Sequence, residues 1–167
     1  MNKKTSYILR YFLLFIGLFF IVLGVSVSAK AGLGTSPIYS VPYTFSKIFP
    51  MSLGTFTLFF NILLIALQIL ILRKQFKLIQ LLQLPIIFVF SFFSDFTFNL
   101  LSGINPTNYI SQWLFCILSF FLVALGVFCE VKADVIMLSG EGLVIAISYV
   151  TKKEFGKIKI IVDSSLV

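Results

Sequence analysis

Three polar side chains recur four residues apart in an apolar, phenylalanine-rich segment: Ser91, Asp95 and Asn99. Residues four apart share one face of a helix, so we expect one polar stripe. If this segment crosses a membrane, an ionised carboxylate there costs at least about 2.5–3.5 kcal/mol, and Asp95 should face the interior of a helix bundle. Two interpretations of Asp95 stay open: a solute- or proton-binding group, and a buried anchor that fixes the register of the helix.

A second polar face lies on residues 54–72, where Thr57, Asn61 and Gln68 share one side of a helix with Gly54. Asn61 is a candidate for lining a solute cavity. The alternative is that these amides only hold helices together, a contribution of about 1 kcal/mol each. For Gln68 we favour this packing interpretation.

The residues from Lys30 to Pro37 form a third candidate site. Gly32 and Gly34 should break a helix there, and Ser36 and Pro37 suit the start of a new one. A helix start offers unpaired backbone N–H groups to an anion, and Lys30 adds a positive charge. Lys30 is also the expected partner of Asp95.

Composition indicates that lipid is the solvent for these residues. The chain has 167 residues, of which 59% are hydrophobic and 11% charged, with 21 Phe, no His and a mean hydropathy of +1.09. The net charge of +7 comes from short Lys and Arg clusters between apolar runs, which argues against nucleic-acid binding. Four stretches have the roughly 20 apolar residues that a membrane span needs: residues 11–29, 54–72, 78–101 and 111–131. The first could instead be a cleaved signal peptide, because it ends in Ala29-Lys30-Ala31.

Orientation follows from the cations, because short loops rich in Lys and Arg stay in the cytoplasm. With the N-terminus inside, only Lys30 and Lys47 of the 13 cations fall outside. This orientation requires that residues 36–49 do not cross the membrane. Their length agrees, because about 14 residues make only roughly 20 Å of helix and the apolar core of a bilayer is about 30 Å thick. We therefore expect a short re-entrant or interfacial helix.

The chain nearly repeats itself 102 positions later. Gly24, Lys30 and Ala31 recur as Gly126, Lys132 and Ala133, and Asn61 corresponds to Asp163. Three spans per copy make the second copy enter from the opposite side, an arrangement that is common in transporters. The predicted fold is thus an all-α polytopic membrane bundle with an inverted-topology repeat.

The predicted domains are these two copies. Residues 1–102 form the first repeat, with three transmembrane helices and the short helix 36–49. Residues 103–167 form an incomplete second repeat, with one full transmembrane helix, a short helix over residues 139–150 and the start of a further span near Ile158. We expect the chain to be truncated relative to a six-span protein.

Enzyme chemistry is not expected. There is no His, and Cys116 and Cys129 lie too far apart on one apolar helix to form a disulfide. The sequence contains no zinc-binding set, no nucleophile and base arrangement and no phosphate-binding glycine motif. We predict no catalytic residues, metal or cofactor.

Several motifs resemble those of one bacterial family. They are Gly24-Val25, the run from Lys30 to Pro37, Leu53-Gly54-Thr55-Phe56 and Gly140-Glu141-Gly142-Leu143. The chain resembles integral membrane proteins of the YczE/YyaS/YitT type over essentially its whole length. Relatives often have Asp where this chain has Gly32, and here only the second copy keeps it, as Asp134. The resemblance implies a multi-pass protein of the bacterial cytoplasmic membrane without an established activity, and it suggests that relatives continue beyond this C-terminus.

Two functions compete. The first is a small permease or channel-like transporter of a small solute, with Asp95, Asn61 and the break around Ser36 along its path. The second is a substrate-binding or accessory membrane subunit that acts through a partner protein. The expected partners are the lipid bilayer and either a second copy of the chain or a membrane partner subunit.

Overall fold

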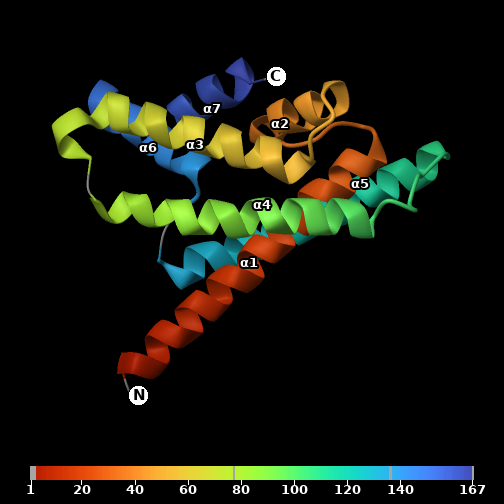
Figure 1. Cartoon of the computed structure of the whole chain (residues 1–167), viewed down its shortest axis with the longest axis horizontal. Coiled ribbons are helices and arrows are strands. Elements are labelled where there is room, and N and C mark those ends of the chain that lie inside the picture. The colour runs from red at the N-terminus through yellow and green to blue at the C-terminus, as the bar shows by residue number, and fades with distance from the viewer. Residues whose placement is uncertain (1–2, 77, 136, 167) are drawn as a thin grey trace. The chain divides into compact units, whose positions relative to one another are not determined.

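Helices make up all of the regular structure in residues 3–76, 78–135 and 137–166, which the computed structural model describes (Figure 1). The α-helices are α1 (Lys3–Ala31), α2 (Pro37–Ile48), α3 (Leu53–Leu72), α4 (Gln83–Leu100), α5 (Tyr109–Ala133), α6 (Ser139–Thr151) and α7 (Phe155–Ser165). Two short 3₁₀ helices, η1 (Arg73–Gln75) and η2 (Leu78–Leu82), lie between α3 and α4. Lys77 and Val167, which the predicted topology uses, lie outside the described residues.

Four helical segments are long and apolar enough to cross a membrane: Ile8–Ala31, Leu53–Leu72, Gln80–Leu100 and Tyr109–Ala133. They match the four predicted spans, and the all-helical class is confirmed. The third span differs at its start, because α4 begins only at Gln83 and η2 occupies the preceding residues. Pro85 explains this difference, since proline is tolerated in the first turn of an α-helix but not in its interior.

The chain divides into two compact units, which interleave the two halves of the sequence. One consists of Met1–Ser36 and Phe92–Val135, and the other of Pro37–Ser91 and Ile136–Val167. Helix α4 contributes its first part to the second unit and its last part to the first.

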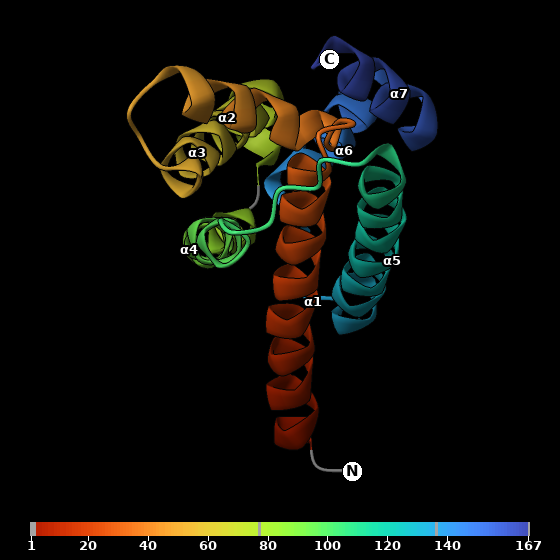
Figure 2. The same cartoon turned by 90° about the vertical axis from the view of Figure 1, so that its right-hand side faces the viewer.

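In the first unit, α1 and α5 pack side by side in opposite directions (Figure 2). Their backbones approach closely at glycines. A Cβ atom placed on Gly17 would lie 2.9 Å from the carbonyl oxygen of Gly126, and one on Gly24 would lie 2.9 Å from the carbonyl oxygen of Ser119. Small residues allow such approach between membrane helices. Because the helices are antiparallel, Lys30 and Lys132 lie at opposite ends of the pair.

The contacts of this helix pair come in matched sets. Gly17 and Gly24 correspond in the repeat to Ser119 and Gly126, so the pair Gly17 with Gly126 becomes the pair Ser119 with Gly24 when the copies are exchanged. Between them, Gly126 faces Ile21 and Gly24 faces Val123, which again correspond to each other. The α1–α5 contact is therefore the same when the two helices are interchanged.

In the second unit, α3 packs against α2 and α6, while α7 packs against α6 and α2. The two short helices meet at Ile38 and Gly140, which are repeat equivalents: a Cβ atom on Gly140 would contact Cδ1 of Ile38. Ser40 Oγ donates to the carbonyl oxygen of Leu166, which joins α2 to the end of α7 at 3.0 Å. A side chain at position 140 would require the Ile38 side chain to turn aside.

Helix boundaries also repeat 102 positions apart. Helix α1 ends at Ala31 and α5 at Ala133; α2 begins at Pro37 and α6 at Ser139; α3 begins at Leu53 and α7 at Phe155. The breaks differ in their chemistry. After α1 the chain turns through Gly32 with φ of 73°, whereas after α5 it turns through Asp134 with φ of 48°, one of the non-glycine residues that tolerate the left-handed region.

Candidate functional site

A buried polar cluster in the second unit lies where α3 meets the start of α6. Asn61 of α3 is 7% exposed, and its Nδ2 donates to the carbonyl oxygen of Thr57 at 2.7 Å. Its Oδ1 accepts a short hydrogen bond from Ser139 Oγ, the first residue of α6. Ser139 is 0% exposed, so no water replaces this partner readily. The contact fixes the beginning of α6 on the polar face of α3.

Gln68 extends the cluster two turns further along α3. Its Nε2 donates to the carbonyl oxygen of Ser139 at 2.9 Å and approaches Oε1 of Gln83 at 3.5 Å. Its own Oε1 is buried and has no hydrogen-bond partner within the part of the chain that the structure describes. Asn61, Gln68 and Gln83 thus place amide groups around one helix start.

The sequence Ser139-Gly140-Glu141-Gly142 allows these side chains to come close to α6. A Cβ atom on Gly142 would lie 2.7 Å from Gln68 Oε1 and 3.0 Å from Gln83 Nε2. Leu138, at the N-cap position, provides no side-chain cap hydrogen bond. A helix leaves N–H groups in its first turn without an intrahelical partner, and here Glu141 places a carboxylate in that turn, near the positive end of the helix dipole.

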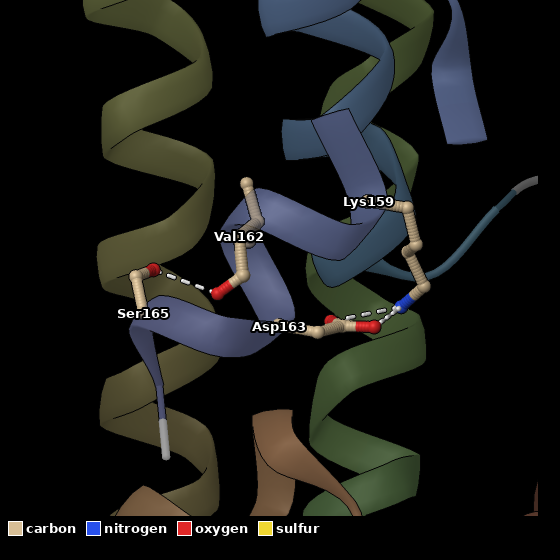
Figure 3. A network of polar contacts seen from close by, with 4 residues as sticks. All are labelled: Lys159, Val162, Asp163 and Ser165. Atoms are coloured by element: carbon tan, nitrogen blue, oxygen red, sulfur yellow. Dashed lines mark hydrogen bonds and ion pairs between the residues drawn. The ribbon is translucent and has the colours of Figure 1, made fainter. Parts of the chain in front are cut away.

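The corresponding positions of the second copy carry charges. Thr57 and Asn61 on α3 correspond to Lys159 and Asp163 on α7. Lys159 Nζ lies 3.2 Å from both carboxylate oxygens of Asp163, and the pair is half-buried (Figure 3). Two residues after Asp163, Ser165 Oγ donates to the carbonyl oxygen of Val162 (Figure 3). The same helical spacing thus holds a neutral pair in one copy and an ion pair in the other.

Polar contacts in the first unit join α1 to α4. Ser26 and Thr97 are both 0% exposed and share a hydrogen bond of 2.8 Å between their hydroxyl oxygens. Lys30 Nζ lies 4.7 Å from the centroid of the Phe98 ring, a cation–π contact. Asp95 lies one turn before Phe98 on α4 and is half-buried. The expected ion pair between Lys30 and Asp95 stays a prediction.

The predicted site residues lie in both units. Asp95, Lys30, Ser36 and Asn99 belong to the first unit, and Asn61 and Ser91 to the second. Of these, Asn61 and Ser91 are buried, Lys30 and Asp95 half-buried, and Ser36 and Asn99 exposed. The Oγ atom of Ser91 has no hydrogen-bond partner in the described chain. The fully buried polar residues of α4 include Ser94 and Thr97, which do not belong to the predicted stripe of Ser91, Asp95 and Asn99.

Sequence reasoning missed several buried polar residues. Ser139 and Gln83 lie at or beside helix starts, and Ser26 and Thr97 lie within apolar helices where hydroxyl groups are common. Ser139 could have been found from the sequence, because it begins a glycine-rich run. It is also the repeat equivalent of Pro37, the residue that follows Ser36 in the first copy. Glu130 of α5 is a further buried polar residue: it is 5% exposed, and its backbone N lies near Gly17. In the described residues, no group of three or more His, Cys, Asp or Glu side chains could hold a metal ion.

Together, the fold and these sites define a helical protein with four candidate membrane spans and buried polar clusters between its helices. The chain belongs to a family of unknown function, DUF6198, whose model matches residues 8–167. No curated protein and no solved structure matches the chain.

Proposed function

We propose that the chain is a multi-pass protein of the bacterial cytoplasmic membrane that moves a small polar solute across the bilayer. In this proposal the N-terminus is cytoplasmic, and two inverted copies each contribute a short helix that does not cross. We also propose that the chain is related to membrane proteins of the YczE/YyaS/YitT type. Both copies would present the start of their short helix, α2 or α6, toward the solute path.

The observation that carries this proposal is the matched packing of α1 against α5. Antiparallel helices whose contacts interchange at an offset of 102 residues are what an inverted repeat requires. The meeting of Ile38 with Gly140 in the second unit supports it in the same way. Repeat interfaces of this kind are where transporters bind their solutes.

The buried polar groups favour solute transport over a purely structural role. A packing role alone would pair these groups, because Ser, Thr, Asn and Gln side chains hydrogen-bond across membrane helices. The α3–α6 contact instead gathers Asn61, Gln68, Gln83 and Ser139 around one helix start, and among the described residues it leaves the buried Gln68 Oε1 unpaired. Non-helical or broken backbone at membrane depth is tolerated where it lines a path or is buried in protein.

The test is flux through the purified full chain reconstituted in liposomes. A panel of neutral, anionic and cationic small solutes is supplied with and without a pH gradient. We expect protein-dependent uptake of at least one solute class. Absence of uptake across the panel, together with a stoichiometric partner that co-purifies from the native membrane, would instead support an accessory subunit.

Asp95 provides a mutational test of the same proposal. We expect Asp95→Asn to leave the folded yield unchanged and to lower flux roughly tenfold or more, because a charge-assisted contact is worth about 1.5–3 kcal/mol. Asp134→Asn is the matched control, since Asp134 is exposed at the end of α5 and Asn tolerates its left-handed backbone. Initial uptake rates in proteoliposomes measure the effect. Equal rates in both variants would leave Asp95 only the role of a structural anchor.

A further inference from the structure

Gln68 and Gln83 form half of a reciprocal amide pair. Two primary amides can exchange two hydrogen bonds, but here only one is present: Gln68 Nε2 lies 3.5 Å from Gln83 Oε1. Gln68 Oε1 lacks a partner in the described chain, and the side chain is 0% exposed. A buried acceptor left unpaired costs about 1–3 kcal/mol. Gln68 Oε1 can therefore accept a hydrogen bond from a further donor.

The orientation of the Gln68 amide is fixed by its neighbour. Its Nε2 donates to the carbonyl oxygen of Ser139 at 2.9 Å. Turning the amide over would place Oε1 against that carbonyl oxygen, and two acceptors repel each other. The unpaired group at this position is thus an acceptor and not a donor.

Gly142 shows where the two amides point. The position of a Cβ atom on Gly142 lies 2.7 Å from Gln68 Oε1 and 3.0 Å from Gln83 Nε2. Gly142 is in the first turn of α6, a helix of 13 residues. The acceptor Oε1 of Gln68 and the donor Nε2 of Gln83 therefore converge beside Gly142.

The charges around this region exclude charged ligands. An anion would meet the lone pairs of Gln68 Oε1, and Glu141 already places a negative charge in the first turn of α6. The cluster side chains Asn61, Gln68, Gln83 and Ser139 are all uncharged, so a buried ion would lack compensation. A neutral group with a donor and an acceptor side by side satisfies both amides.

We propose that Gln68, Gln83 and the first turn of α6 bind a neutral solute through a carboxamide or urea group. The solute N–H donates to Gln68 Oε1, and its carbonyl oxygen accepts from Gln83 Nε2. This assignment rests on the proposed transport function, because it names the solute class of that protein. It needs neither a metal nor a charged side chain.

Three probes of nearly equal size and shape test the solute class: acetamide is neutral, acetate carries a negative charge and acetamidinium carries a positive charge. Binding to the full chain in nanodiscs is measured by saturation-transfer NMR. We expect acetamide to bind at least about tenfold more tightly than either ion. Equal binding of the three probes, or preference for an ion, would overturn the assignment.

Two substitutions locate the site. Gln68→Met and Gln83→Met should each weaken acetamide binding roughly tenfold by removing one hydrogen bond. The Gln83 side chain is 5% exposed, and Gln83→Met provides the test if Gln68→Met does not fold. Gln112→Met is the control, because Gln112 belongs to the first unit and donates to the carbonyl oxygen of Pro106. Undiminished acetamide binding in Gln83→Met would exclude the site.

The outcomes separate this inference from the proposed function. Acetamide binding that depends on Gln83, without flux of any solute, would support the site and count against transport. Flux of other solutes without acetamide binding would retain transport and reject the amide site.

Discussion

Gly126→Ala should strongly destabilise the protein. The added Cβ atom would lie 2.6 Å from the backbone N of Ile21 and 2.7 Å from the carbonyl oxygen of Gly17. Because these are backbone atoms, α1 and α5 must move apart instead of one side chain turning aside. Overpacking costs about 1–3 kcal/mol, and we expect the upper end of that range. This corresponds to a decrease of roughly 6–12 °C in the apparent Tm.

Thermal unfolding of the detergent-purified protein measures this effect. Gly24→Ala should match Gly126→Ala, because the two glycines are repeat equivalents and a Cβ atom on Gly24 would lie 2.9 Å from backbone atoms of α5. Gly103→Ala is the control, since nothing lies within 4 Å of its Cβ position. If Gly126→Ala and Gly103→Ala unfold at the same temperature, the close α1–α5 packing is incorrect.

Ser139→Ala should destabilise the second unit through its effect on Asn61. The substitution removes the donor to Asn61 Oδ1, and Asn61 is only 7% exposed. Hydrogen bonds between membrane helices average about 0.6 kcal/mol, but a buried acceptor without a replacement partner costs about 1–3 kcal/mol. Since Ser139 itself is 0% exposed, we expect a loss of about 1–2 kcal/mol.

A double-mutant cycle with Asn61→Leu isolates this interaction. The double variant should be less destabilised than the sum of the two single variants by about 1 kcal/mol, because Asn61→Leu removes the stranded acceptor. Ser165→Ala is the control: its hydroxyl is exposed and bonds only within α7, to Val162. Additive effects of the two cluster substitutions would show that Ser139 and Asn61 do not interact.

The sequence predicted the helices well because their signal is local. Each of the four spans is a long apolar run, and Gly32 and Gly34, with φ of 73° and 129°, end the first helix as predicted. Short helices appear at Pro37–Ile48 and Ser139–Thr151, where the sequence predicts helices over residues 36–49 and 139–150. The start of α4 was misplaced by several residues, since η2 has the same apolar composition as the α-helix that follows it.

The candidate site was less predictable because it depends on which helices meet. A spacing of four placed Ser91, Asp95 and Asn99 on one face, but it could not show that Asn99 is exposed. Gln68 was interpreted as a packing residue, and only the approach of Ser139 and Gln83 shows its unpaired Oε1. Such pairings join residues far apart in the chain, so periodicity alone does not give them.

The central claim is that the two copies have opposite orientations in the membrane, and sided labelling tests it most directly. Single cysteines replace Leu33 and Lys132, both exposed, in a background where Cys116 and Cys129 are changed to Ser. A membrane-impermeant maleimide is then applied to intact cells and to inside-out vesicles. We predict that Leu33→Cys reacts only in cells and Lys132→Cys only in inside-out vesicles. Reaction of both cysteines from the same side would contradict the inverted arrangement.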